Sequence, residues 1–253
     1  MTPGSSAAVD AGQVRDLASG CSTLTDLDGA ISECRACPRL VQWREQVARD
    51  KRKSFADEAY WGRPVPGFGD EQPAVLVVGL APAAHGGNRT GRVFTGDRSG
   101  DWLFASMCRA GLANQPESTG PNDGLRLIRA RVVAAVRCAP PANKPTPVER
   151  DACAPWLDRE FELIQPELRV VVALGSFAWN ACLAMLQRSG ETLPSPRPRF
   201  THGAVAVLGA VTLLGCFHPS QQNTFTGRLT REMLDAVFTQ AAALMSGVNG
   251  REE

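Results

Sequence analysis

The sequence has no long apolar run, no excess of one charge and very little lysine. A membrane-spanning helix needs roughly 20 apolar residues in a row, and no stretch approaches that length. No basic segment followed by an apolar core, the pattern of a secretory signal, opens the chain. These absences predict a cytoplasmic protein with no membrane partner. The formal net charge of +1 gives no overall field that would attract nucleic acid, so any phosphate binding must come from a local group of charges.

Lysine occurs only at positions 51, 53 and 144, so nearly all basic residues are arginine. Arginine suits bidentate contacts with phosphate, but a GC-rich genome would give the same bias, and composition does not separate the two explanations. The eight cysteines are expected to be free or to bind metal, because cytoplasmic proteins seldom keep disulfides.

Short apolar runs alternate with helical patterns through most of the chain. Buried strands are predicted at residues 75–78, 131–136 and 170–174, and two further short strands at 205–208 and 211–214. Helical patterns occupy 24–52, 99–111, 146–164, 176–190 and the segment from 230. This order predicts one α/β domain of three layers, in which helices cover both faces of a mostly parallel sheet of four to five strands.

Composition also suggests where the domain begins and ends. Residues 1–20 are small and polar and are expected to form a mobile tail. Residues 21–246 are the predicted domain, and residues 247–253 a C-terminal tail. Within the domain, the proline- and glycine-rich residues 62–73 form a connector that leads into the first strand.

Polar residues gather after three of the predicted strands. The first strand ends at Gly79 and is followed by a long polar loop, and such loops are more often functional than not. Arg137–Pro145 follows the second strand and His218–Ser220 follows the last. Because ligands of such sheets bind beyond the carboxyl ends of the strands, we expect these three segments to meet in one cleft.

Four cysteines have a spacing that suggests a metal site. Cys34 and Cys37 form a CxxC pair, and Cys138 and Cys153 follow after 100 and then 14 intervening residues. Four thiolates can hold a [4Fe–4S] cluster or a structural zinc ion, although this is not a zinc-finger spacing. Four unrelated buried thiols remain the alternative. The other cysteines are expected to lie in the core, at a strand end or in the N-terminal tail.

Four segments resemble the type-5 (family 5) uracil-DNA glycosylases, an iron–sulfur branch of the uracil-DNA glycosylase superfamily in bacteria and archaea. The segments are CRACPRL (34–40), GLAPAAHGGNRTGRVFTGDRSGDWL (79–103), VRCAPPANKPTP (136–147) and HPSQQNTFTGRLT (218–230). The resemblance reaches from Cys34 to the final helix, about four-fifths of the chain. It implies a monofunctional DNA N-glycosylase of base excision repair, a hydrolase. Such an enzyme flips the damaged base out of the duplex and hydrolyses its N-glycosidic bond, which leaves an abasic site.

The resemblance also implies a cofactor. It assigns a structural [4Fe–4S] cluster to Cys34, Cys37, Cys138 and Cys153. The cluster would tie the N-terminal helical segment to the loop after the second strand, and the reaction itself requires no chemistry at the cluster.

The resemblance assigns three residues to catalysis. Positive charge builds on the sugar and negative charge on the departing uracil, so a carboxylate near the sugar and a donor near uracil O2 are needed. Asp97 is expected to position water or stabilise the cation, and His218 to stabilise the uracil anion. The tetrad Gly79–Pro82 has no polar side chain, whereas other branches of the superfamily have one there, which shifts this role to Asp97. Asn143 is expected to contact the base or the adjacent backbone. Asp97 as a helix cap and Asn143 as a turn residue are the alternatives.

The resemblance places the base among residues of the first loop. Phe94 is expected to stack on the flipped base, with plain core packing as the alternative. Three small residues allow close approach of backbone N–H groups to the base edge: Gly79, Ala81 and Ala83. His85 is a further candidate for contact with the base, with a structural role as its alternative. A pocket built this way rejects bases loosely. We therefore expect excision of hypoxanthine, and of some other modified bases, in addition to uracil.

The partner that the resemblance implies is DNA containing uracil or other deaminated bases. Residues 220–228 are expected to wedge into the minor groove. The candidate DNA contacts are Ser220, Gln221, Asn223 and Arg228, with Arg89, Arg92 and Arg98 for phosphates. We expect a monomer, because flipping one base needs no symmetry. We also expect it to act at the nucleoid. The alternatives are a non-catalytic iron–sulfur DNA-binding or redox-sensing module of the same fold and a zinc-stabilised nucleotide hydrolase.

Overall fold

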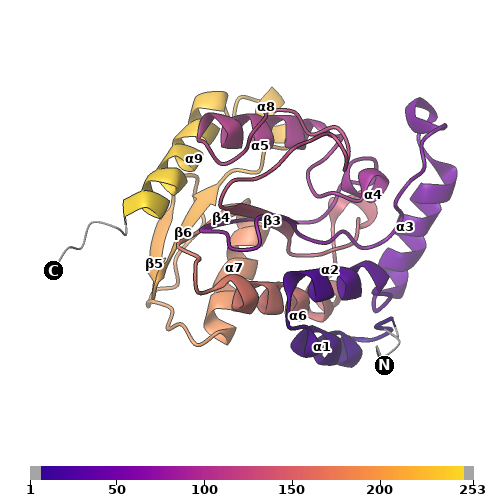
Figure 1. The fold of residues 1–253 in the computed structure, drawn as a ribbon, viewed down its shortest axis with the longest axis horizontal. Coiled ribbons are helices and arrows are strands. Elements are labelled where there is room, and N and C mark those ends of the chain that lie inside the picture. The colour runs from indigo at the N-terminus through magenta and orange to yellow at the C-terminus, as the bar shows by residue number, and fades with distance from the viewer. Residues whose placement is uncertain (1–6, 248–253) are drawn as a thin grey trace.

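The computed structural model describes residues 7–247 and contains a sheet of six strands in the order β1-β3-β2-β4-β6-β5, with helices on both faces (Figure 1). The four inner strands are parallel to one another: β2 (Val75–Gly79), β3 (Ala130–Ala134), β4 (Val170–Leu174) and β6 (Val211–Cys216). Their short apolar runs are buried because helices cover both faces. The predicted α/β architecture with a mostly parallel sheet is therefore confirmed.

The number of strands differs from the prediction of four to five. Both edges of the sheet are antiparallel: β1 (Phe68–Gly69) pairs with β3, and β5 (Val205–Leu208) pairs with β6. The strand β1 lies in the segment that the sequence predicts as a connector. It is only two residues long, and a two-residue strand leaves no alternation that a sequence pattern reveals.

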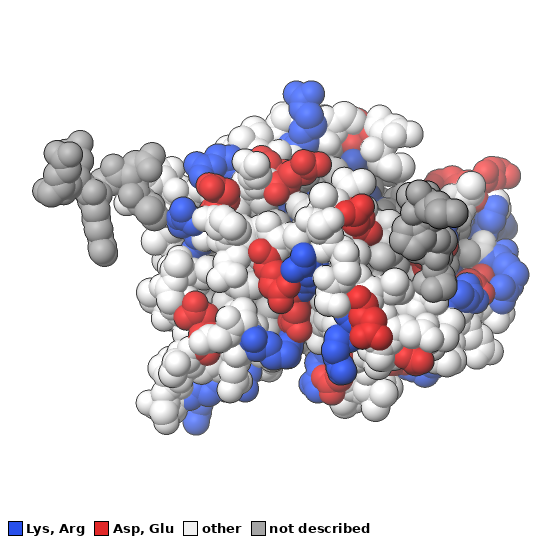
Figure 2. Space-filling model, turned by 60° about the horizontal axis from the view of Figure 1, so that its bottom comes forward, with Lys and Arg blue, Asp and Glu red and all other residues white. Residues whose placement is uncertain are grey.

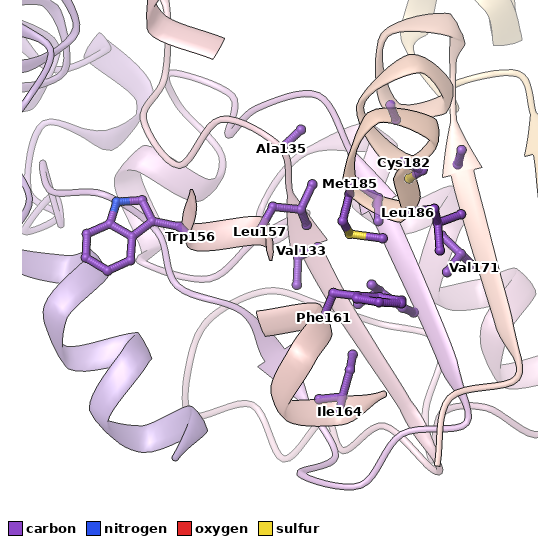
Figure 3. Packing of buried hydrophobic residues seen from close by; sticks show 14 of the residues in the cluster. Val133, Ala135, Trp156, Leu157, Phe161, Ile164, Val171, Cys182, Met185 and Leu186 are labelled. Atoms are coloured by element: carbon purple, nitrogen blue, oxygen red, sulfur yellow. The ribbon is translucent and has the colours of Figure 1, made fainter. Parts of the chain in front are cut away.

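Alternate residues of the central strands point into two separate cores, one on each face of the sheet. On one face, α5 (Arg98–Arg109) and α9 (Arg231–Ser246) cover the side chains of Val75, Val77, Val170 and Val172. On the other face, α6 (Pro147–Ile164) and α7 (Ser176–Arg188) cover those of Leu76, Val78, Val133 and Val171. Figure 3 shows Phe161, Leu157 and Ile164 of α6 and Met185 and Leu186 of α7 packed against the strands.

The predicted mobile tail at residues 1–20 is wrong for the part that the structure describes. Residues 11–20 form the helix α1 (Ala11–Gly20), whose Val14 and Ala18 are buried against α6. Asp10 caps the helix, and the Arg159 guanidinium of α6 donates two hydrogen bonds to the Cys21 carbonyl oxygen at 2.9 and 2.7 Å. The helix packs through small side chains, so the sequence has low hydrophobicity and looks like a tail.

The outermost residues of both predicted tails, 1–6 and 248–253, lie outside the described residues. Gly247, the first residue of the predicted C-terminal tail, is the C-cap of α9. No helix among residues 7–247 is long and apolar enough to cross a membrane.

The predicted helical segment at 24–52 consists of two helices, α2 (Leu24–Glu33) and α3 (Pro38–Asp50), followed by a short 3₁₀ turn, η1 (Lys53–Phe55). Thr23 and Asp26 form a capping box at the start of α2, and Pro38 occupies the first position of α3. The CxxC pair therefore lies at the corner between two helices.

A buried ion-pair network joins three of these elements. Glu160 of α6 is fully buried and accepts hydrogen bonds from Arg131 of β3, at 2.5 Å, and from Arg137 beyond β3. Arg131 also donates to both carboxylate oxygens of Asp28 in α2, at 2.9 and 2.8 Å. Gly67 passes so close that a Cβ there would lie 2.1 Å from a Glu160 oxygen. The network fixes α2 and α6 relative to β3, which orients the segments that carry the cysteines.

Candidate active site and cysteine cavity

The loops after β2 and β6 meet through an aromatic contact. The ring of Phe94 lies 5.7 Å from the ring of His218, measured between centroids, with 33° between the planes. Gly79 ends β2 directly beneath, and a Cβ on it would lie 2.6 Å from Phe94 Cζ. The loop after β3 lies alongside, because the Ala135 and Val136 N–H groups donate to the carbonyl oxygens of Gly79 and Leu80. The predicted meeting of strand ends is thus observed.

Phe94 has a left-handed backbone, with φ +51°. This conformation costs about 1–3 kcal/mol for such a residue and persists where the surroundings enforce it. Here Gly100 presses against the Phe94 carbonyl, since a Cβ on Gly100 would lie only 1.9 Å from that oxygen. The ring is buried (7% exposed) and points at His218. It packs as a core residue, and the prediction that it stacks on a base remains a prediction.

Asp97 is the N-cap of α5, so its predicted alternative role is present. One carboxylate oxygen, Oδ1, accepts hydrogen bonds from the backbone N–H groups of Ser99 at 2.9 Å and Gly100 at 3.0 Å. The other, Oδ2, accepts no hydrogen bond from the described residues and faces Gly86, where a Cβ would lie 2.1 Å away. Burial raises the pKa of Asp97, and the two backbone hydrogen bonds oppose that shift. Capping therefore orients the carboxylate and leaves one oxygen free for another partner.

His218 is half-buried, and neither of its ring nitrogens has a hydrogen-bond partner within residues 7–247. Burial lowers the pKa of His218 to about 4, so the imidazole is neutral at pH 7. Asn223 of the helix α8 (Gln221–Phe225) donates to the His218 carbonyl oxygen at 2.9 Å and fixes the loop. A neutral imidazole can donate one hydrogen bond without carrying a charge into the site.

His85 lies in the same loop as Asp97 and has a partner that sequence reasoning missed. Its Nδ1 lies 3.0 Å from the hydroxyl of Tyr60. Burial lowers the pKa of His85, and the nearby charges of Arg52 and Arg89 lower it further. Tyr60 belongs to no motif and precedes the connector, so nothing in the pattern pointed to it. Ala83 turns the same loop, since its carbonyl oxygen accepts from the Gly86 and Asn88 N–H groups.

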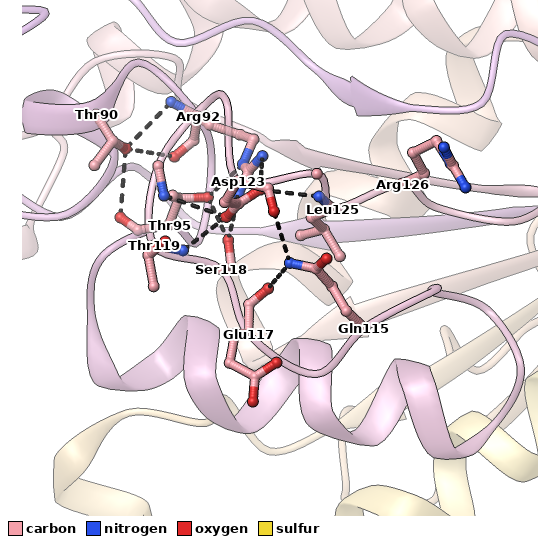
Figure 4. Close-up of polar contacts among 12 residues, drawn as sticks. Thr90, Arg92, Thr95, Gln115, Glu117, Ser118, Thr119, Asp123, Leu125 and Arg126 are labelled. Carbon is pink, nitrogen blue, oxygen red and sulfur yellow. Dashed lines mark hydrogen bonds and ion pairs between the residues drawn. The ribbon is translucent and has the colours of Figure 1, made fainter.

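Two of the predicted phosphate ligands are internal, which corrects the prediction. Arg89 is 8% exposed and pairs with Glu58, while also donating to the carbonyl oxygens of His85 and Gly96. Arg92 is 5% exposed and binds Asp123, Thr95 and Ser118, a network shown in Figure 4. Because their donors are occupied by acceptors of the protein itself, these arginines support the loop.

The remaining predicted DNA contacts lie at the surface. Arg98 and Arg228 are exposed, and each guanidinium lies over an aromatic ring, at 4.4 Å from that of Phe225 and 4.6 Å from that of Phe217. Gln221 is exposed, and Ser220 and Asn223 are half-buried near the start of α8.

Asn143 is exposed in the turn η2 (Pro141–Asn143), with a left-handed φ of +55° that asparagine tolerates well. Its N–H donates to the Pro140 carbonyl oxygen, and its side chain makes no hydrogen bond to the described residues. Asn143 therefore occupies a turn, the alternative that the sequence offered for it. Its side chain makes no hydrogen bond to Asp97 or His218 in the described chain.

The four predicted metal ligands line one small cavity. Cys34 and Cys37 come from the corner before α3, Cys138 from the loop after β3, and Cys153 from α6. Burial raises the pKa of Cys37 to about 12 and that of Cys138 to about 11. Cys138 and Cys34 are close enough to raise the pKa of Cys37 further. Bare thiolates are thus unfavourable, whereas a bound metal group displaces their protons.

Two buried arginines at this cavity lack acceptors for part of their guanidinium groups. Arg44 is 2% exposed, has no carboxylate partner in the described chain, and donates to Cys138 Sγ at 2.9 Å and to the Cys34 carbonyl oxygen at 3.1 Å. Its Nε has no partner, nor do Nε and Nη1 of Arg137, whose backbone N–H donates to Cys153 Sγ at 3.3 Å. Buried cations without acceptors fit a negatively charged group between the four sulfurs.

Within residues 7–247, no three side chains of His, Cys, Asp or Glu are grouped closely enough to hold a metal ion.

Comparisons with known proteins identify relatives over most of the chain. Residues 66–242 match the family model described as "Uracil DNA glycosylase superfamily". The chain is 58% identical over 229 residues to a type-5 uracil-DNA glycosylase of Mycobacterium tuberculosis, covering 90% of this chain and 84% of the relative. It is 53% identical to the type-5 enzyme of Thermus thermophilus, over 85% and 94% of the two chains. A type-4 uracil-DNA glycosylase of Pyrobaculum aerophilum is 28% identical over 78% of this chain and 83% of that protein.

The lowered pKa of His218 gives a testable pH dependence of stability. Its pKa falls from 6.5 to about 4 on folding, so between these values the unfolded chain binds a proton that the folded chain excludes. Its contribution is therefore fully present above pH 6.5 and is lost as the pH falls toward 4, with a slope of at most about 1.4 kcal/mol per pH unit. Urea unfolding of the wild type should show a steeper loss over this window than the His218→Gln variant. Equal slopes would contradict the neutral, buried imidazole.

Proposed function

The chain belongs to the uracil DNA glycosylase superfamily, and from that premise we propose that it is a DNA repair hydrolase that excises uracil. The substrate is DNA that contains uracil, and the bond broken is the one between uracil N1 and deoxyribose C1′. Water supplies the oxygen that replaces the base, and the product is an abasic site. The observation that carries the proposal is the contact of Phe94 with His218, with Asp97 three residues after Phe94 in the same loop, in a chain that is 53–58% identical to type-5 enzymes.

The sugar needs a negative partner as the bond breaks, because its anomeric carbon gains positive charge. We assign this role to Oδ2 of Asp97, which no described residue occupies. The same oxygen can orient the attacking water. The hydrogen bonds that Oδ1 accepts from the start of α5 hold the carboxylate in place and spare the cost of reorganising it during the reaction.

The departing uracil needs a donor, because negative charge collects on its O2. His218 supplies this donor as a neutral imidazole. A neutral imidazole keeps its N–H proton, whereas a charged one can lose a proton to solvent before the bond breaks. Phe94, next to His218, offers its ring to the flipped base. Backbone N–H groups of the segment that begins at Gly79, with Ala81 and Ala83, can read the base edge.

DNA itself is expected to bind over the exposed residues around Phe94 and His218. Arg98 and Arg228 carry the positive charge, and Ser220, Gln221 and Asn223 lie on the segment that we expect to enter the minor groove. Asn143 is kept as a candidate contact to the base or to the DNA backbone. The enzyme is expected to act as a monomer on nucleoid DNA.

The four cysteines are proposed to hold a [4Fe–4S] cluster, which supplies a structural clamp and takes no part in bond cleavage. Support comes from the shared cavity of the four thiols and from the unpaired donors of Arg44 and Arg137 beside it. A four-thiolate cluster carries negative charge, so a buried guanidinium that donates to Cys138 Sγ would both neutralise it and shield the sulfur from exchange.

Removing the two catalytic groups should abolish most activity without unfolding the protein. Asparagine is as good an N-cap as aspartate, so Asp97→Asn keeps the start of α5 and removes the charge alone. We expect Asp97→Asn and His218→Ala each to lower the single-turnover rate on a uracil duplex by about 10²- to 10³-fold, measured as strand breaks after alkali. Asp97→Ala should in addition lose about 1 kcal/mol of stability.

The control is Asp158→Asn, an acid on α6 that pairs with Arg188 far from the site, which should react at the wild-type rate. If Asp97→Asn also does so, Asp97 only caps the helix. A wild type that binds DNA but excises no base would instead indicate a non-catalytic module of the same fold.

We propose a base range wider than uracil, because the tetrad Gly79–Pro82 offers no polar side chain to reject other bases. Matched oligonucleotides that differ only in carrying uracil, hypoxanthine or a modified pyrimidine should all give product, with uracil fastest. Excision of uracil alone would rule out this extension and leave the proposed activity intact.

The cluster is tested by metal content. The purified wild type should be brown and contain about four iron atoms per chain, and Cys138→Ser or Cys153→Ser should lose most of the iron and the visible absorbance. Cys182→Ser, a buried cysteine of α7 away from the cavity, should keep both. Zinc in place of iron, or full iron retention in the Cys138→Ser variant, would contradict the assignment.

A further inference from the structure

A second basic site lies beside the proposed active site. A surface pocket of about 410 Å³ opens along α5, from its first to its last residue, beside the start of α9, on the face of the sheet that these helices cover. It is lined by Arg98, Asp101, Trp102, Ala105, Arg109 and Arg231. Figure 1 shows α5, α8 and α9 grouped together at the top of the molecule, well away from α1 and α6.

Two of the arginines in this pocket keep all their hydrogen-bond donors free. The side chains of Arg98 and Arg231 are exposed and make neither an ion pair nor a hydrogen bond with the part of the chain that the structure describes. Arg109 differs, because Asp235 accepts two hydrogen bonds from it at 2.8 and 2.6 Å. The pocket has three arginines against two acids, Asp101 in the lining and Asp235 beside Arg109, so it carries an excess of positive charge.

Aromatic rings support both free guanidinium groups. Arg98 lies over the ring of Phe225 at 4.4 Å, and Arg231 over the ring of Trp102 at 5.6 Å. Stacking on a ring face fixes the plane of a guanidinium and leaves the N–H groups at its edge directed outward. Two flat, oriented cations at one pocket match the oxygens of a phosphate, which arginine binds through pairs of parallel hydrogen bonds.

The position of the pocket identifies the phosphate. Arg98 directly follows Asp97 in the chain, and Phe225 ends α8, the helix that follows His218. The pocket therefore adjoins both loops that form the active site. Elsewhere the charge is mixed: on the face in Figure 2, acidic and basic side chains are interspersed without a large area of one sign. A net charge of +1 makes such a local site the means of holding a polyanion.

We propose that the pocket formed by Arg98, Arg231 and Trp102 binds a backbone phosphodiester of DNA, a few nucleotides from the base in the cleft. This inference rests on the proposed function and adds to it a phosphate site that includes Arg231, which lies outside every sequence motif. Arg98 and Arg231 bind the phosphate oxygens, and Phe225 and Trp102 hold the two guanidinium planes. The contact supplies affinity and register on the DNA and takes no part in bond cleavage.

The test uses the salt dependence of DNA binding. Each phosphate contact adds about 0.9 to the slope of log Kd against log salt concentration for duplex DNA. The Arg98→Gln/Arg231→Gln double variant should bind a fluorescent, uracil-free duplex several-fold more weakly at low salt, with a slope smaller by about one. Its single-turnover rate on a uracil duplex at subsaturating enzyme should fall in the same proportion as its affinity, because the contact serves binding.

Two controls separate this site from general charge effects. Arg98→Lys/Arg231→Lys keeps the charges and should keep the salt slope, while affinity falls because the paired hydrogen bonds are lost. Arg188→Gln, which removes an arginine paired with Asp158 on the opposite face of the sheet, should leave both quantities unchanged. A double glutamine variant with the wild-type slope and Kd, or an equal effect of Arg188→Gln, would overturn the proposal.

Free phosphate is the other source of the same chemistry. If millimolar inorganic phosphate raises the Tm of the wild type but not of the double variant, and DNA affinity is unaffected by the substitutions, the pocket takes a free anion and the proposal is wrong. Failure of the pocket and failure of the enzyme remain distinct. A wild type that excises uracil while all variants bind alike contradicts only the pocket, whereas a wild type without excision contradicts the proposed function.

Discussion

The buried carboxylate of Glu160 holds together the elements that carry the candidate active site and the cysteine cavity. Glu160 balances the charges of Arg131 and Arg137, which would otherwise be isolated cations in the core. Removing one partner of such a buried group commonly costs about 3–5 kcal/mol. Because Glu160 lies on the helix that carries Cys153, while Arg137 immediately precedes Cys138, the same network places two sulfurs opposite each other. The fold and the cysteine cavity therefore depend on one set of hydrogen bonds.

Much of the fold could be read from the sequence, because its central strands are continuous apolar runs in an alternating order with helices. The meeting of Phe94 and His218 also followed from a topological rule, that parallel strands end at one edge. The hydrogen-bond partners of the arginines could not be predicted from the sequence in this way. Arg89 and Arg92 look like phosphate ligands until Glu58 and Asp123 are found beside them, and a pattern does not reveal which acid reaches an arginine from about 30 residues away.

The other differences have similar causes. The helix α1 buries alanine and valine with few large side chains, so low hydrophobicity hid its packing against α6. Tyr60 touches His85 from a segment without any motif. For Asp97, the two readings offered by the sequence, cap and carboxylate, proved to be compatible, because each uses a different oxygen.

The ion pair between Arg92 and Asp123 indicates the structural role of the segment 115–125. Asp123 accepts two hydrogen bonds from Arg92 and three from backbone N–H groups of its own turn, and although burial opposes it, these contacts hold the pKa of its carboxyl below the ordinary range. The segment 115–125 therefore supports the loop that contains Phe94 and Asp97. Homologues that shorten it would have to support this loop by other means, and substitutions within the segment can shift Phe94 and Asp97 without replacing either residue.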